Sequence, residues 1–183
     1  MSLPTINTSD MGGSASLTLV QTKSAFKGSL VVMDCGDFSL CIPSQDAVSV
    51  VSCKELVVLP QWEESCGYVD VMEQRYPVFC ITKSLQLQKT IAQEHHVIVL
   101  LSAQQYFFAI SCRAISKIES AQLQIFSVPV AMRSRKQPFS EFAIVDDRAV
   151  GLTSAAHVLA FLQLRGAKLA FQDEGAISVQ GVI

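Results

Sequence analysis

The chain has 183 residues; half of them are hydrophobic, 16% are charged, and the formal net charge at pH 7 is −2. This length suits one domain, or two small subdomains that share a core. The slightly acidic balance gives no general positive field, so we expect no nucleic acid among the partners.

The sequence contains no candidate membrane span or export signal. Its longest aliphatic run, Val97 to Leu101, is far shorter than the ~20 residues that a spanning helix needs. The first residues lack the basic start and the apolar stretch of a signal peptide. We therefore expect a cytoplasmic protein without direct membrane insertion. Residues 1–16 are rich in Ser, Thr and Gly, which is typical of a disordered tail.

From residue 17 onward the first half of the chain has the pattern of a β protein. Residues 29–33 are rich in β-branched residues, residues 35–37 are typical of a turn, and residues 38–42 alternate in hydropathy, which predicts a hairpin. Short strands are expected at 48–51 and 55–59. A second strand pair is expected at 68–72 and 77–81.

The second half repeats this scheme and adds one helix. A hairpin is expected from residues 96–101 and 106–110, followed by strands at 115–118, 124–130, 142–145 and 149–152. Only residues 153–164 have a helical period. Thr153 or Ser154 would cap this helix and Gly166 would end it. Its apolar positions on one face are Ala156, Leu159, Ala160 and Leu164.

Two stretches about 68 residues apart share one pattern. Beginning at Phe38 and at Tyr106, each runs from an aromatic residue through alternating apolar positions to a short Ala-Val-Ser or Ala-Ile-Ser motif. The spacing is too long for a propeller blade or a solenoid repeat. The duplication, the many short strands and the single helix predict an all-β fold of two small barrels with a closing helix.

The six cysteines, at positions 35, 41, 53, 66, 80 and 112, form neither a CxxC pair nor a zinc-type cluster. Most lie in apolar runs, which indicates reduced core thiols. The neighbours His95 and His96 would point to opposite faces of a strand, so they cannot hold one ion. We interpret them as the polar beginning of a strand. No metal and no cofactor are expected.

The segment GYVDVMEQRYPVFCI, residues 67–81, resembles the signature of the CheW-like coupling proteins of bacterial chemosensing. That pattern reads Gly-x-x-Asn-Leu-Arg-Gly, three variable residues, then Pro-[Val/Ile]-x-Asp-Leu. The matching positions are Gly67, Pro77 and Val78; the conservative replacements are Val71 and Ile81; the departures are Asp70 for Asn, Met72 for Arg, Glu73 for Gly and Cys80 for Asp.

The flanking sequence supports this resemblance over roughly residues 26–165. A Gly-Asp turn and an aromatic strand precede the segment, and closing strands and a helix follow it. Arg113 stands where the family usually has Asp. The resemblance divides the chain into a tail (1–16), a CheW-like domain (17–165) and a C-terminal extension (166–183).

The resemblance implies two intertwined, five-stranded SH3-like barrels. It implies a non-catalytic adaptor that couples the cytoplasmic tip of a chemoreceptor to a CheA-type histidine kinase. Barrel ends would contact the kinase, and the groove between subdomains would take the receptor helix. The divergence suits the branch that serves type IV pili and twitching. A small-barrel enzyme or ligand-binding protein with a thiol site at Cys66 or Cys80 is the alternative, and a fast thiol would favour it.

Carried over to this sequence, the family signature also implies a partner-binding segment. Met72 lacks the donors of the family's Arg, and Glu73 adds bulk and charge where the family has Gly, so we expect weak receptor contact. Arg75 is expected on the same strand face as Glu73, where it would neutralise that charge. The expected partner-binding residues are Gly67, Asp70, Val71, Met72, Glu73, Arg75 and Pro77.

Overall fold

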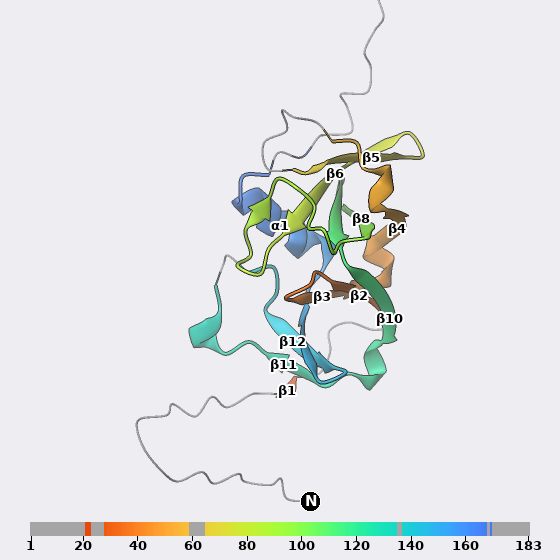
Figure 1. Ribbon diagram of the computed structural model, residues 1–183. Helices are drawn as coiled ribbons and strands as arrows, with labels where there is room; N and C mark the ends of the chain where they lie inside the picture. Colours follow the sequence, from red (N-terminus) through yellow and green to blue (C-terminus); the bar gives the residue numbers. More distant parts are fainter. Residues whose placement is uncertain (1–20, 23–27, 59–64, 135–136, 168, 170–183) are drawn as a thin grey trace, which may run out of the picture.

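The computed structural model describes residues 21–22, 28–58, 65–134, 137–167 and 169 (Figure 1). The predicted tail, and all of the extension except residues 166, 167 and 169, lie outside the described residues. Within the described part, no helix is long and apolar enough to cross a membrane. The structure consists of two curled β-sheets, here called sheet A and sheet B, with one α-helix.

Sheet A contains strands from both ends of the domain. Its order is β1-β11-β12-β13-β3-β2-β10. The bounds are β1 (Gln21–Thr22), β2 (Ser29–Asp34), β3 (Ser39–Pro43), β10 (Ala114–Glu119), β11 (Ile125–Ser127), β12 (Glu141–Val145) and β13 (Arg148–Leu152).

Sheet B has the order β4-β8-β9-β6-β5, and the short strand β7, which is not part of this order, also pairs with β6. Figure 1 shows the β5–β6 hairpin at one end of the molecule and β11 and β12 toward the other. The bounds are β4 (Ala47–Ser52), β5 (Gly67–Val71), β6 (Gln74–Ile81), β7 (Leu87–Gln88), β8 (Val97–Ala103) and β9 (Tyr106–Cys112).

The two repeats exchange strands. The hairpin β2–β3 lies in sheet A, but the next strand, β4, pairs with β8 of sheet B; the hairpin β8–β9 lies in sheet B, but β10 pairs with β2 of sheet A. The registers correspond, since Ala47 faces Leu101 and Ala114 faces Asp34. A parallel pair then extends each sheet, β3–β13 in A and β6–β9 in B. The duplicated sequence pattern therefore encodes two intertwined subdomains.

The largest core lies between the two sheets and under the helix. Smaller clusters fill each sheet separately, around Leu30 and Ile125 in A and around Val69 and Ala109 in B. Because the shared cluster draws on both repeats, the subdomains are not independent folding units. Its fully buried large side chains include Met33, Leu40 and Ile42 from sheet A, Phe79, Phe108 and Ile110 from sheet B, and Phe161 from the helix.

The helix α1 (Ala155–Leu164) buries a different face from the one predicted. Ala156 and Ala160 are exposed and Leu164 is 67% exposed, so of the predicted face only Leu159 is buried. The helix is apolar almost all round, and periodicity alone cannot choose between two apolar stripes. The stripe with the larger side chains removes more area from water. The buried residues are Ala155, Val158, Leu159, Phe161 and Leu162.

Both ends of α1 are capped as the sequence indicated. Ser154 Oγ accepts from the His157 N–H at 3.3 Å. Asp46, in the 3-10 helix η1 (Ser44–Asp46), accepts from the Ala155 N–H at 2.8 Å and so ties the helix to the chain crossing before β4. At the other end Gly166 has φ 83°, and the Gly166 and Ala167 N–H groups bond Gln163 and Leu162, as in a Schellman motif.

Two predicted strands are shorter than expected or absent. Residues 53–55 form the 3-10 helix η2 (Cys53–Glu55) instead of entering a strand. Ser52 and Glu55 make a reciprocal capping box there. Their side chains accept hydrogen bonds from backbone N–H groups that would otherwise pair with a neighbouring strand. Only an isolated bridge at Val57 follows, and residue 59 lies outside the described part. Strand β11 stops at Ser127, and η4 (Val130–Met132) follows; a further short helix is η3 (Ser120–Gln122).

Asp46→Ala is expected to lower the free energy of unfolding by about 1 kcal/mol, because the first turn of α1 loses an acceptor and a favourable charge. Asp46→Asn keeps an acceptor and should cost less. Urea unfolding of the three proteins at neutral pH measures the difference. An alanine variant as stable as the unchanged protein would contradict this role.

Candidate functional site

The segment with the family signature forms the β5–β6 hairpin. Val71 faces Gln74 across a two-residue turn, and the turn residues Met72 and Glu73 have φ 50° and 64°. Two consecutive positive φ values identify a type I′ turn, which favours Asn and Gly. Met72 is 95% exposed. The hairpin therefore presents these two residues to the solvent at its tip.

Arg75 does not neutralise Glu73, so that prediction is wrong. Glu73 lies in the turn, whereas Arg75 faces Asp70 across the hairpin. The Arg75 Nε and Nη2 atoms lie 2.9 and 3.1 Å from the two Asp70 carboxylate oxygens. Its guanidinium also stacks on the ring of Tyr68, 3.9 Å from the centroid. This bidentate and stacked arrangement fixes Arg75 on the body of the hairpin.

Gly67 and Pro77 are buried and hold the hairpin from inside. Gly67 has φ 141°, and a Cβ there would lie 2.3 Å from the carbonyl oxygen of Val57. Only glycine permits this approach. Val71 is half-buried, while Asp70, Met72, Glu73 and Arg75 are exposed. The seven predicted residues are thus brought together in one hairpin, four of them on its surface.

A second group of polar side chains lies buried where the subdomains meet. His95, just before β8, has Nδ1 3.0 Å from Ser111 Oγ of β9 and 3.8 Å from Cys80 Sγ of β6. Its Nε2 lies 3.4 Å from the carbonyl oxygen of Cys35. His95 is only 5% exposed and His96 is exposed. The pair does lie at the beginning of a strand, as predicted, but the burial of His95 was not predicted.

Little in the sequence indicated this group. Cys80 and His95 are 15 positions apart with no motif between them, and their contact depends on the order of strands in sheet B. The one usable sign was Cys80 itself, because it replaces the family's Asp within the signature.

The cysteines are free and, apart from half-buried Cys53, buried, which confirms their prediction as core residues. Burial raises the pKa of Cys41 and of Cys112 to about 12. The pKa of Cys80 is instead lowered, first by a hydrogen bond from the Cys66 thiol and also by those from His95 and Ser111. Burial lowers the pKa of His95, but its contacts with Cys80, the Cys35 carbonyl and the charge of Glu94 together raise it more, and the net shift is upward.

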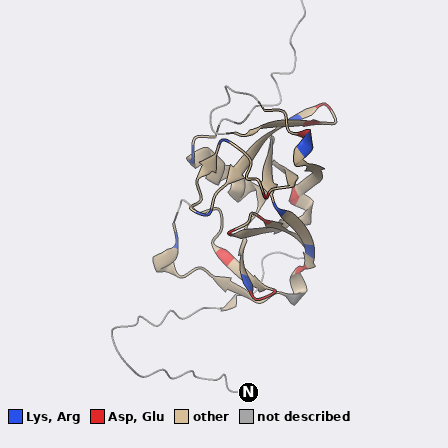
Figure 2. Ribbon diagram, viewed as in Figure 1, with Lys and Arg blue, Asp and Glu red and all other residues tan. Residues whose placement is uncertain are grey.

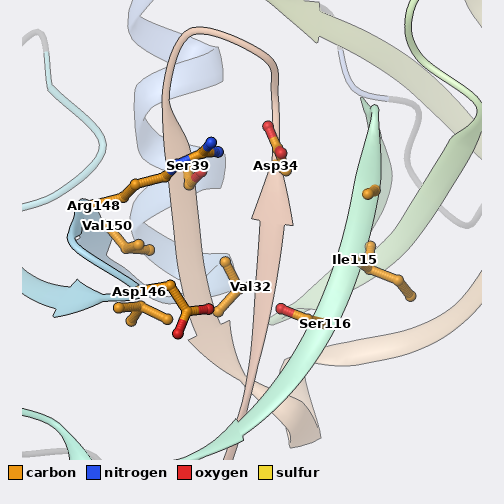
Figure 3. Close-up of a pocket in the computed structure, with 10 residues that line it drawn as sticks. Val32, Asp34, Ser39, Ile115, Ser116, Asp146, Arg148 and Val150 are labelled. Atoms are coloured by element: carbon orange, nitrogen blue, oxygen red, sulfur yellow. The ribbon is translucent and has the colours of Figure 1, made fainter.

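Two pockets open on the described surface. One, of about 490 Å³, lies between the β2–β3 turn of sheet A and the β6–β7 segment of sheet B, and Cys80 and His95 line it. The other, of about 380 Å³, lies against β2, β10 and the β12–β13 turn of sheet A. In Figure 3 Arg148 extends toward Ser39 in this second pocket. Among the described residues, no group of three or more His, Cys, Asp or Glu side chains could hold a metal ion.

The departure at Arg113 has a local partner. Its Nη2 lies 2.6 Å from Asp34 Oδ2 and its N–H donates to the Asp34 carbonyl at 2.7 Å. Burial raises the pKa of Asp34, but hydrogen bonds from Arg113 and the Gly36 N–H, with the charges of Arg113 and Arg148, together lower it more. The pair joins the start of β10 to the end of β2, where the repeats exchange strands. Figure 2 shows basic and acidic residues interspersed along the ribbon.

Glu73→Gly is expected to raise the free energy of unfolding by about 0.5–1 kcal/mol, because glycine adopts φ 64° without the steric cost that a Cβ brings. Glu73→Ala removes the same charge but keeps the Cβ, so it should not stabilise. Urea unfolding separates the two. Equal stabilisation by both variants would assign the effect to charge and contradict the backbone explanation.

Comparison with known proteins agrees with the signature. The family model of the CheW-like domain matches residues 29–167. The solved structure of the scaffolding protein TtCheW from Thermoanaerobacter tengcongensis is similar over 69% of this chain and 88% of its own, with 15% identity and a TM-score of 0.49. No curated protein matches the sequence. Since the family model spans well over half of the chain, including both subdomains and α1, the protein belongs to the CheW-like domain family.

Proposed function

We propose that the protein is a non-catalytic adaptor in the cytoplasm that couples the cytoplasmic tip of a chemoreceptor to a CheA-type histidine kinase. The observation that carries the proposal is the family match over residues 29–167. It takes in both intertwined subdomains, which the family uses as a scaffold. The departures from the signature favour the branch that serves type IV pili and twitching.

An apolar surface on sheet B supports a protein partner. Strand β4 is an edge strand, and Val48 forms a bulge in its pairing with β8. Val48 is 50% exposed and Val58, after the strand, is 66% exposed. Val50 and Val57 are also exposed. Exposed aliphatic side chains concentrated in one short segment are typical of an interface. We assign the kinase contact to this β4 surface, defined by Val48, Val50, Val57 and Val58.

The hairpin tip is the proposed receptor contact. Met72 and Glu73 are displayed there, and Arg75 is held by Asp70 and Tyr68. The tip thus offers a thioether and a carboxylate, where the family offers a guanidinium and a bare backbone. Packing replaces charge-assisted hydrogen bonding at this contact.

One observation favours a second role for the same fold. The Cys80–His95 contact is a thiol–imidazole pair beside a pocket, and such pairs activate thiols. This role is compatible with the adaptor, because none of the four residues of the β4 surface lines that pocket.

The full chain is expected to bind the CheA-type kinase of its source organism, with a Kd that changes by less than about threefold between low and physiological salt, because the β4 surface is uncharged. Val48→Asp should weaken binding at least about tenfold, since a carboxylate would be desolvated in the interface. Ile144→Asp is the matched control, because Ile144 is a 42%-exposed aliphatic residue of sheet A.

Titration calorimetry measures the Kd of each variant, and circular dichroism checks that each variant is folded. Absence of kinase binding by the unchanged, folded protein would refute the proposed function. A collapse of affinity with salt, or equal losses from the two Asp variants, would refute the β4 surface as the contact.

The double variant Met72→Arg/Glu73→Gly is expected to bind a receptor cytoplasmic fragment about tenfold to a hundredfold more tightly than the unchanged protein, because it regains a charge-assisted hydrogen bond. Glu73→Gly alone is the control and should recover only part of the gain. If the unchanged protein already binds that fragment as tightly as the double variant, then Met72 and Glu73 have not weakened the receptor contact, and this explanation is wrong.

A further inference from the structure

We propose that Cys80 and Cys66 form a peroxide-reactive dithiol, in which Cys80, activated by His95, is oxidised first and Cys66 then closes a disulfide with it. The site is distinct from the hairpin tip and the β4 surface, and its test does not depend on any partner of the adaptor.

His95 is placed to take the thiol proton. Its Nε2 lies 3.4 Å from the Cys35 carbonyl oxygen, which can only accept, so the neutral ring carries its hydrogen there. Nδ1 is then the free acceptor, and it faces Cys80 Sγ at 3.8 Å and Ser111 Oγ at 3.0 Å. Transfer of the Cys80 proton to Nδ1 gives a thiolate–imidazolium pair, and Ser111 solvates it.

The electrostatics agree with this direction of transfer. The Cys66 thiol donates toward Cys80, which lowers the pKa of Cys80 and raises that of Cys66. Cys80, and not Cys66, is the thiolate of the pair, because His95 contacts Cys80. Neither Cys41 nor Cys112 has such a contact: burial raises the pKa of Cys41, and burial followed by the nearby Cys53 and Asp34 raises that of Cys112.

Cys66 is held beside Cys80 by the backbone. Its N–H donates to the Val78 carbonyl at 2.8 Å, and its Sγ lies 3.1 Å from the Gln88 carbonyl oxygen. Gln88 is the residue paired with Cys80 between β7 and β6. The Cys66 thiol is therefore held beside the β6–β7 pair that contains Cys80, and the two thiols shift each other's pKa.

The pocket between the subdomains gives access to a small oxidant. Cys80 is 1% exposed, so a reagent must reach it through the pocket. The pocket of about 490 Å³ is lined by Cys80 and His95, with Thr82 and Ser84 at its wall. Hydrogen peroxide is small, neutral and able to hydrogen-bond such hydroxyl groups. Cys66 does not line the pocket, which suits a thiol that reacts second.

The reaction balances with hydrogen peroxide as the oxidant. The Cys80 thiolate attacks one peroxide oxygen, the O–O bond breaks, and the leaving hydroxide takes the proton of imidazolium His95 as water. Cys80 is now a sulfenic acid. The Cys66 sulfur attacks it, the S–O bond breaks, and the hydroxide leaves as a second water with the Cys66 proton. Two thiols lose two electrons, and peroxide is reduced to water. The disulfide would enclose residues 66–80, the hairpin that displays Met72.

The test is peroxide oxidation of the folded full chain, followed by alkylation, digestion and mass spectrometry. We expect a Cys66–Cys80 disulfide in the unchanged protein. Cys66→Ser should stop at a sulfenic acid on Cys80 that dimedone captures, and His95→Gln should slow oxidation at least about tenfold. Cys41→Ala, in the separate core of sheet A, is the matched control and should leave rate and product unchanged.

Iodoacetamide labelling of the unchanged protein gives a second readout that does not depend on the folding of any variant. At neutral pH Cys80 should be labelled at least about tenfold faster than Cys41 or Cys112. Labelling of Cys80 no faster than these two, or a peroxide-induced disulfide between other cysteines, would overturn the proposal.

Discussion

Each of the two sheets is completed by a strand that belongs to the other repeat. Sheet B needs β4, which belongs to the first repeat, and sheet A needs β10, which belongs to the second. Each sheet leaves a hydrogen-bonding edge open until the other repeat supplies its strand. The shared core then forms only when both are in place. The two subdomains therefore fold together, and a substitution where the chain crosses from one sheet to the other should destabilise both.

The exchange also explains where polar groups are buried. The chain must cross between sheets after β3 and after β9, and the crossings place Asp46 against the N-terminus of α1 and Arg113 against Asp34. The parallel pairing of β6 with β9 brings Cys80 and Ser111 to the same region as His95. Polar side chains in an otherwise apolar chain thus gather at the boundary between subdomains, where backbone groups and other side chains satisfy them.

The sequence predicted what depends on local alternation and missed what depends on strand order. Both repeated hairpins, the β5–β6 pair and the caps of α1 follow from patterns of a few residues, and the structure contains them. The buried face of α1 did not follow, because its sequence is apolar on two sides. The burial of His95 did not follow either, since its partners come from strands that are distant in the chain. The hairpin signature located the predicted contact segment, but the positive φ angles at its tip became visible only with the turn.

The β5–β6 and β12–β13 turns share one backbone conformation but contain residues that differ in how well they tolerate it. Asp146 and Asp147 in the β12–β13 turn have φ 47° and 61°, nearly the values at Met72 and Glu73. Asp tolerates the left-handed region, because its short side chain hydrogen-bonds locally, whereas Met and Glu gain no such compensation. The register of β5 and β6 and the close approach at Gly67 hold the turn in this strained form. A costly conformation that keeps a methionine 95% exposed does not stabilise the fold, and it supports the proposal that the tip contacts a partner.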